Sequence, residues 1–243
     1  MHVDFLRLFL RSLLLLMCPI LQYAQTLPCP GAPEIEYGGQ YYRTVQIGDQ
    51  CWLKDNLNVG VMVKSVFTES RHADVSDNGV IEKYCYGDNP DNCALFGALY
   101  DWKEAMGYVD TPGTQGICPP GWHIPTDEEW CNLVRFLDPA AKCQIWGGCS
   151  KHSGGKLKDR NDKLWSSPNT DATNESGFAA LGAGFRYIHG DFYSLKYYAY
   201  YWSSTESSPS MAVAWYLYNS SAMAYRYRKY KTYGFSVRCM KDE

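Results

Sequence analysis

The chain has 243 residues, of which 46% are hydrophobic, 15% aromatic and 20% charged, and its net charge is −3. A chain of this length can bury a complete core, and its aromatic content argues against intrinsic disorder. This net charge is mildly acidic, whereas nucleic-acid-binding proteins carry an excess of basic residues, so we expect no nucleic-acid partner.

The first residues have the pattern of an export signal. Arg7 and Arg11 precede an uninterrupted apolar run, residues 13–21, and Ala24 supplies a small residue before the expected cleavage point. A membrane helix needs roughly 20 apolar residues, so this run is too short to span a bilayer. We predict a signal peptide over residues 1–24 and a secreted or cell-surface protein that does not span the membrane after cleavage.

The same residues allow two alternatives to a cleaved signal. The apolar run could be retained as a membrane anchor, against which its length argues. Cys18 could instead carry a lipid, as in outer-membrane lipoproteins. This alternative is less favoured because the preceding residue, Met17, is bulky where lipoprotein signals carry a small residue.

Ten cysteines occur, and nine remain after cleavage of residues 1–24. None forms a C-x-x-C pair, so an exported chain is predicted to hold disulfides rather than zinc. The short spacings of Cys85 with Cys93 and of Cys143 with Cys149 are typical of local loop bridges. The odd total implies a free thiol, a cross-linked second chain or a different cleavage site. Spacing alone leaves the partners of Cys29, Cys51 and Cys131 open.

The first ordered segment is predicted to be a hairpin. Residues 37–57 contain two β-rich runs separated by Gly48-Asp49, which places Val45 and Ile47 on one face. Residues 59–84 are polar and irregular and are predicted to form a loop that ends in a strand.

Two helices are predicted in the middle of the chain. Residues 92–107 have apolar side chains at three- and four-residue steps, which predicts an amphipathic helix that ends at Gly107. These side chains are Leu95, Leu99, Trp102 and Met106. A second helix is predicted from Asp127 to about Leu137, because Thr126 and Glu129 match a capping box.

The stretch GICPPGWHIPTDEEWCNLV, residues 116–134, could be a catalytic site or a structural corner. Capping chemistry already accounts for its acidic residues, and its prolines stiffen the approach to the helix. His123 stands beside Trp122, where a lone histidine is more often structural. We therefore predict a structural corner.

The last third of the chain is predicted to be an antiparallel meander. Residues 143–178 are rich in Gly, Ser, Asn and Asp and form a long loop, which short strands follow. Alternation is clearest in AVAWYLYN, where Val213, Trp215 and Leu217 share one face. Strands, two helices, long loops and then a sheet together define an α+β class.

Seven motifs follow one another in the order of a known domain. They are YRTVQIGDQCWLKDNLN, YGDNPDNCALFGALYDWKEAM, QGICPPGWHIPTDEEW, SGGKLK, ESGFAALGAGFR, YYWSSTE and GFSVRCMK. On these motifs the chain resembles the Fibrobacter succinogenes major paralogous domain family of exported and surface proteins of Bacteroidetes and Fibrobacteres. The resemblance covers residues 40–241, after a short lead at residues 25–39.

The resemblance implies a C-type-lectin-like fold, related to that of formylglycine-generating enzymes, with two main helices, antiparallel strands and long disulfide-stapled loops. It also implies bridges between Cys118 and Cys239 and between Cys85 and Cys93. The first would close a loop of about 120 residues, which in the chain-entropy model stabilises by about 4 to 5 kcal/mol.

The function expected is recognition without catalysis, with a carbohydrate or a surface protein as partner. Aromatic side chains on alternating strands are the candidate ligand-binding residues: Tyr198, Tyr200, Trp202, Trp215, Tyr225 and Tyr227. A structural envelope protein or a protein-interaction module without a small-molecule ligand is the alternative. An enzyme is not expected: no cysteine lies between Trp202 and Arg238, where the formylglycine-generating relatives place theirs, and neither H-E-x-x-H nor G-x-S-x-G occurs.

Calcium is the one cofactor considered, because lectin-like folds often hold it and oxygen-rich loops suit a hard cation. The candidate ligands are Asp159, Asn161, Asp162, Asp171 and Glu175. The loop lacks the glycine and glutamate of a helix-loop-helix calcium site, and no lectin-type E-P-N or W-N-D tripeptide is present. Asn and Asp are also what turns require without any metal.

Overall fold

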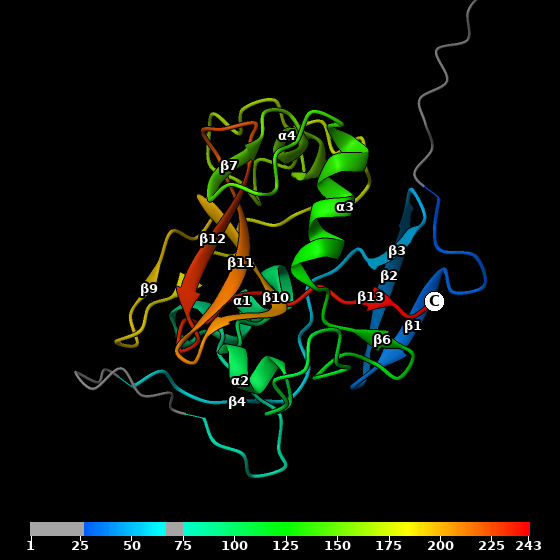
Figure 1. Cartoon of the computed structure of the whole chain (residues 1–243). Helices are drawn as coiled ribbons and strands as arrows, with labels where there is room; N and C mark the ends of the chain where they lie inside the picture. The colour runs from blue at the N-terminus through cyan, green and yellow to red at the C-terminus, as the bar shows by residue number, and fades with distance from the viewer. Residues whose placement is uncertain (1–26, 67–74) are drawn as a thin grey trace, which may run out of the picture.

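The computed structural model describes residues 27–66 and 75–243. The predicted signal peptide, the alternative lipidation site at Cys18 and part of the predicted loop 59–84 lie outside the described residues. Two larger sheets and one long helix organise the chain (Figure 1). The helix α3 (Asp127–Leu137) contacts strands of one sheet directly and the other sheet through the Trp52–Trp130 ring contact.

The first sheet has five strands in the order β1-β2-β3-β13-β6, with every neighbouring pair antiparallel. Its strands are β1 (Glu34–Tyr37), β2 (Gln40–Ile47), β3 (Gln50–Leu53), β13 (Met240–Lys241) and β6 (Trp122–His123). The predicted hairpin is confirmed: Gly48-Asp49 joins β2 to β3, and Val45 and Ile47 are both buried. Gly48 has a φ of +63°, which a glycine adopts without strain.

The second sheet has the order β10-β11-β12-β7 and is antiparallel throughout. Its strands are β10 (Tyr198–Ser208), β11 (Met211–Tyr218), β12 (Ala224–Tyr230) and β7 (Gly147–Ser150). The predicted meander is confirmed in β10 to β12. Two short pairs complete the β-structure: β4 (Val61–Met62) with β5 (Glu82–Lys83), and β8 (Phe185–Arg186) with β9 (Phe192–Tyr193).

The helices are short apart from α3. They are η1 (Tyr86–Asp88, a 3₁₀ turn), α1 (Pro90–Phe96), α2 (Trp102–Ala105) and α4 (Ser153–Leu157). The prediction of one continuous helix over residues 92–107 is wrong. Gly97, at φ +80°, ends α1, and Leu99 and Tyr100 form backbone bridges with Tyr84 and Phe235. Tertiary backbone pairing overrides the helical spacing of the apolar side chains.

The α3 helix matches its prediction from Asp127 to Leu137, including the capping box. Thr126 Oγ1 accepts a hydrogen bond from the Glu129 amide at 3.2 Å, and a Glu129 carboxylate oxygen accepts one from the Thr126 amide at 2.6 Å. On the buried side of the helix, Trp130 contacts the rings of Trp52, Phe178, Tyr201 and Trp215. The predicted structural corner therefore leads into the centre of an aromatic core.

Four disulfides connect the described residues. The pairings Cys118–Cys239 and Cys85–Cys93 are confirmed, and Cys29 pairs with Cys51. The predicted pairing of Cys143 with Cys149 is wrong, because Cys143 is bonded to Cys131. Cys149 is buried and unbonded in β7, where its Sγ lies 3.4 Å from the Ala224 carbonyl oxygen of the neighbouring strand.

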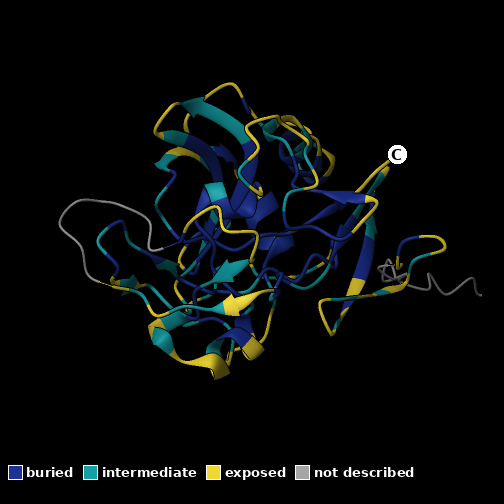
Figure 2. Cartoon of the chain, turned by 90° about the horizontal axis from the view of Figure 1, so that it is seen from below, coloured by how far each residue is buried: buried dark blue, intermediate teal, exposed yellow. Residues whose placement is uncertain are grey.

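Buried residues fill the middle of the molecule, and exposed residues lie mainly at its periphery (Figure 2). One core contains Trp102, Trp202 and Phe235, and a second contains Trp52, Trp130 and Trp215. Strands β10 and β11 contribute to both cores, one on each face, so both faces of this sheet are at least partly covered. The observed mixture of sheets and helices is of the α+β kind expected.

Within the described residues, no helix has the length and apolar character needed to cross a membrane.

Candidate functional site

One face of the second sheet carries six tyrosines, which we call the tyrosine face. It consists of Tyr198 and Tyr200 on β10, Tyr216 and Tyr218 on β11, and Tyr225 and Tyr227 on β12. Alternate residues of a strand point to the same side of a sheet. The antiparallel register sets Tyr198 opposite Tyr218, Tyr200 opposite Tyr216, and Tyr216 opposite Tyr225. The face is thus built from cross-strand aromatic pairs, which stabilise sheets.

The rings of the tyrosine face stack on one another. The ring centroids of Tyr216 and Tyr225 lie 4.9 Å apart with 15° between the planes. Tyr200 and Tyr216 are also 4.9 Å apart, and Tyr198 and Tyr218 are 5.3 Å apart. Each aromatic pair contributes roughly 0.5–1.5 kcal/mol beyond the area it buries. The rings therefore form a fixed array before any ligand arrives.

The hydroxyl groups of this array form a short network at its β11–β12 end. The hydroxyl oxygens of Tyr218 and Tyr225 lie 3.0 Å apart, and Ser221 Oγ lies 3.1 Å from the Tyr225 hydroxyl oxygen. Burial raises the pKa of Tyr216 to about 12, so its hydroxyl stays protonated at neutral pH. The face combines apolar ring surface with hydroxyl groups that donate and accept hydrogen bonds. This combination is the reason that tyrosine is enriched at binding interfaces.

Exposure increases from β10 outwards to β12. Tyr200 is 7% exposed, whereas Tyr227 is 48% exposed. Tyr198, Tyr218 and Tyr225 are of intermediate exposure. A ligand could contact these outer rings without any rearrangement of the sheet.

Two of the six predicted ligand-binding residues do not reach this surface. Trp202 is fully buried beneath Phe235, with ring centroids 4.4 Å apart, and its indole N–H donates to the Tyr100 carbonyl. Trp215 points to the opposite face of the sheet, where its indole N–H donates to Asp127 at 3.0 Å. Both tryptophan rings therefore lie in the core rather than at this surface.

The tyrosine face continues into the hairpin formed by β8 and β9. Phe185 lies 5.2 Å from Tyr200, 5.9 Å from Tyr193 and 6.0 Å from Tyr233, between ring centroids. Tyr193 is 47% exposed. The aromatic surface therefore extends beyond the three strands of the meander.

A buried lysine stabilises the turn that joins β11 to β12. Lys158 is 0% exposed, and its ammonium donates to the carbonyls of Thr170 at 2.9 Å, Tyr218 at 3.2 Å and Ser221 at 2.8 Å. Burial lowers the pKa of Lys158 to about 8. The buried Lys158 ammonium thus donates hydrogen bonds to backbone carbonyls at the turn between Tyr218 and Tyr225.

Three of the five predicted calcium ligands have local partners. Asp159 accepts from the Asn161 amide and Asn161 from the Lys163 amide, both as turn-stabilising side chains. Glu175 forms an ion pair with Lys156 at 2.9 Å. Asp162 is exposed and Asp171 adopts a φ of +52°. No group of three or more His, Cys, Asp or Glu side chains suited to a metal occurs in the part of the chain that the structure describes.

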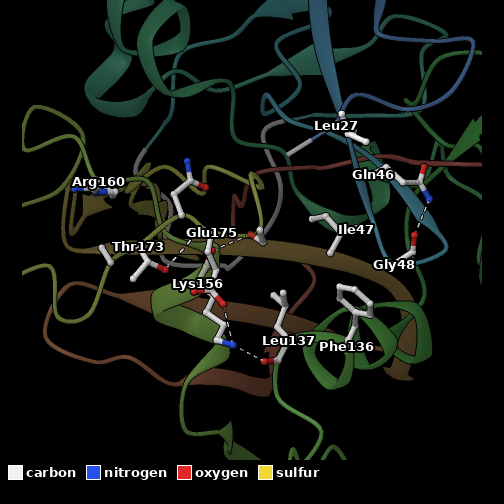
Figure 3. A pocket seen from close by; sticks show the side chains of 13 residues that line it. Leu27, Gln46, Ile47, Gly48, Phe136, Leu137, Lys156, Arg160, Thr173 and Glu175 are labelled. Atoms are coloured by element: carbon white, nitrogen blue, oxygen red, sulfur yellow. Dashed lines mark hydrogen bonds and ion pairs between the residues drawn. The ribbon is translucent and has the colours of Figure 1, made fainter. Parts of the chain in front are cut away.

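A groove of about 1070 Å³ lies away from the tyrosine face, between β2, α3 and the loop 172–176 (Figure 3). Its apolar side is formed by Ile47, Leu137 and the 61% exposed Phe136. Its polar side carries the Lys156–Glu175 ion pair, and Lys156 also donates to the Leu137 carbonyl at 3.0 Å. Nothing in the sequence pattern predicted this groove, because its walls come from segments that are far apart in the sequence.

His123 sits between two carboxylates. Its Nδ1 is 2.6 Å from Asp242 and its Nε2 is 3.1 Å from Glu129. Burial lowers the pKa of His123, but the hydrogen bonds to Glu129 and Asp242 outweigh it, so the net shift is upward. With both ring nitrogens engaged, the imidazole joins the corner to the last strand, which agrees with a structural role.

Sequence reasoning missed Tyr216 and Tyr218, the two tyrosines at the centre of the face. The signal was available: if Val213, Trp215 and Leu217 share one side of a strand, the intervening residues share the other. Charged residues of β12 were also missed, notably Lys229, whose ammonium lies over the rings of Tyr200 and Tyr227.

The model of the Fibrobacter succinogenes major domain matches residues 45–241 of this chain. Because the match covers most of the chain, the protein belongs to that family. No curated protein and no solved structure matches the chain significantly.

Proposed function

We propose that this protein is a non-catalytic, exported recognition module that binds glycans or other envelope components through the tyrosine face. The observation that carries the proposal is the array of six tyrosines on one sheet face, of which five stack on one another and all but Tyr200 are at least partly exposed. Flat rings with hydroxyl edges contact sugar faces at low entropic cost, because a tyrosine has few rotatable bonds to order.

The proposal includes a C-type-lectin-like fold and a location outside the cytoplasm. The Cys118–Cys239 bridge supports the fold, since it ties the segment before α3 to the last strand. Four disulfides support an oxidising compartment, because such bonds are rare in the cytosol.

A second candidate is a structural or protein-interaction role without a small-molecule ligand. The observation that favours it is shape: the groove of about 1070 Å³ lies at α3 and β2 rather than on the tyrosine face. A sheet surface of stacked aromatic rings is compatible with a protein partner.

Binding through the tyrosine face is proposed to be independent of calcium. The oxygen-rich residues Asp159 and Asn161 are already engaged by backbone amides of their own loop. Calcium binding at this loop is the alternative, and the experiment below separates the two.

The test is retention of the purified mature protein on immobilised glycans and polysaccharides, with calcium and again with chelator. Retention that is equal under both conditions is expected. Loss of retention on chelation would indicate that the ligand binds at the calcium loop instead. No retention on any glycan would overturn carbohydrate binding and favour a protein partner.

A further inference from the structure

A lysine of β12, Lys229, lies on the same side of the sheet as the tyrosine face, and the position of its ammonium suggests the chemical class of the ligand. Lys229 lies on β12 at alternate spacing from Tyr225 and Tyr227 and therefore on the same side of the sheet. Its ammonium is 5.4 Å from the ring centroid of Tyr200, 5.5 Å from that of Tyr227 and 5.7 Å from that of Tyr233. Three rings thus surround one charge.

The aromatic rings hold this ammonium without using its hydrogen-bond donors. A lysine ammonium has three N–H donors, and a ring face attracts the charge through its quadrupole. Within residues 27–66 and 75–243, Lys229 forms no ion pair and no side-chain hydrogen bond. Burial lowers its pKa from the usual value.

Neighbouring lysines show that carboxylate partners are available in this region. Lys231, two residues along, pairs with Glu206 at 3.1 Å. Lys103 pairs with Asp110 at 2.5 Å. Glu206 lies on the same cross-strand row as Lys229, through Ala212, yet its carboxylate goes to Lys231. Of these three lysines, Lys229 alone has no carboxylate partner within the described residues.

We propose that the tyrosine face selects acidic glycans, with Lys229 as the residue that binds the carboxylate of a uronic acid. This inference rests on the proposed function and specifies its substrate class. Successive outward residues of a strand are about 7 Å apart. Tyr225, Tyr227 and Lys229 therefore present two ring platforms and then a cation in one line, so a sugar chain stacked on the rings brings an acidic substituent to the ammonium.

The test compares polygalacturonate with its methyl ester, which has the same backbone without the charge. Affinities are measured for the full mature protein and for Lys229→Met, which keeps the apolar stem. Lys241→Met, at an exposed position on β13, is the matched control with the same change in net charge. Lys229→Arg tests rescue, and thermal unfolding of each variant checks that it is folded.

The wild type and Lys241→Met are expected to prefer the acid over the ester. Lys229→Met is expected to bind the acid about tenfold or more weakly, because the free energy of one hydrogen bond to a charged group corresponds to a change of that size. Its affinity for the ester is expected to change little. Lys229→Arg is expected to retain the preference.

Four results would overturn the inference. The wild type could bind acid and ester equally, or bind neutral glycans but neither of these polymers; both leave the proposed function standing. Lys229→Met and Lys241→Met could weaken acid binding equally, which would indicate only a general charge effect. Failure of the wild type to bind any glycan would remove the proposed function as well.

Discussion

At the scale of single residues, two fully buried cations join segments that are far apart in the sequence. Arg238, in the GFSVRC motif, donates to Asn56 and to the carbonyls of Phe178 and Ala179 in the GFAALGAGFR motif. Lys158, in SGGKLK, donates to carbonyls around the β11–β12 turn. Both satisfy backbone oxygens that would otherwise be buried without a donor, which costs free energy. Segments that carry several of the sequence motifs are therefore physically connected through these side chains.

Lys158→Met is predicted to lower the free energy of unfolding by about 3 kcal/mol, because several charge-assisted hydrogen bonds are lost and buried carbonyls are left unsatisfied. Lys163→Met, at an exposed position on the same loop, is the control and is expected to change stability by less than about 0.5 kcal/mol. Urea unfolding measures both. Equal stability of the two variants would show that the buried ammonium is not needed.

Tyr227→Ala is predicted to weaken glycan binding by about tenfold, the loss typical of one stacked anchor, while leaving stability nearly unchanged. The reason is that Tyr227 is 48% exposed, so its ring forms part of the surface rather than of the core. Tyr41→Ala is the matched control, since Tyr41 is 66% exposed on β2, in the other sheet. Titration calorimetry on a retained glycan compares them. If both substitutions reduce binding equally, the tyrosine face is not the site.

At the scale of elements, α3 and the corner before it act as one unit. The capping box fixes the first turn of α3, while Glu129 also contacts His123 of β6. His123 in turn reaches Asp242 beyond β13. One carboxylate therefore connects the helix N-terminus to the first sheet, which places Trp130 in the core.

This arrangement makes stability depend on pH through His123. Its hydrogen bonds to Glu129 and Asp242 raise the pKa in the folded protein above about 6.5, the unfolded value, despite burial, which opposes the shift. The stabilisation is therefore fully present below about pH 6.5 and is lost as pH rises through the folded pKa.

The stability advantage of the wild type over His123→Gln is predicted to be larger at pH 6 than at pH 9. Chemical unfolding at a series of pH values measures this difference. An advantage that stays constant across the range would contradict the charged pairing of His123 with its two carboxylates.

At the scale of the whole molecule, β10 and β11 separate two cores, and one long-range disulfide ties the segment before α3 to the end of the chain that carries the last strand. Cys118–Cys239 has a sequence separation of 121, whereas Cys85–Cys93 has a separation of 8. In the chain-entropy model the long bridge restricts the unfolded chain more than the short one.

Replacing both Cys118 and Cys239 by alanine is predicted to cost about 5 kcal/mol of unfolding free energy, against about 2.5 kcal/mol for Cys85 with Cys93. Thermal and denaturant unfolding of the two double variants measures the difference. A larger loss for the short bridge would show that local geometry, rather than chain entropy, decides the contribution of these disulfides.

Local signals in the sequence predicted the elements that depend on neighbouring residues. The Gly48-Asp49 hairpin, the capped helix and the meander are specified by turn, capping and alternation patterns. The break at Gly97 was not predictable this way, since the chain after it pairs with segments distant in the sequence. Nor was the Cys131–Cys143 pairing, because Cys149 lies in β7, which pairs with the distant strand β12.

The candidate site was predicted in part. Tyrosine enrichment located the face, but which aromatic rings stay exposed depends on what covers each end of the sheet. Phe235 covers Trp202, whereas the rings of β12 remain partly open. The groove at Phe136 escaped prediction for the same reason, because its walls meet only in the folded chain.

Hydroxyl-radical footprinting with a retained glycan tests the central claim most directly, because it locates the contact surface residue by residue. The account predicts that the glycan protects Tyr198, Tyr218, Tyr225 and Tyr227 from oxidation while Tyr41 and Phe136 react as in the free protein. Protection of Phe136 and the groove around it, with the tyrosine face unchanged, would contradict the account.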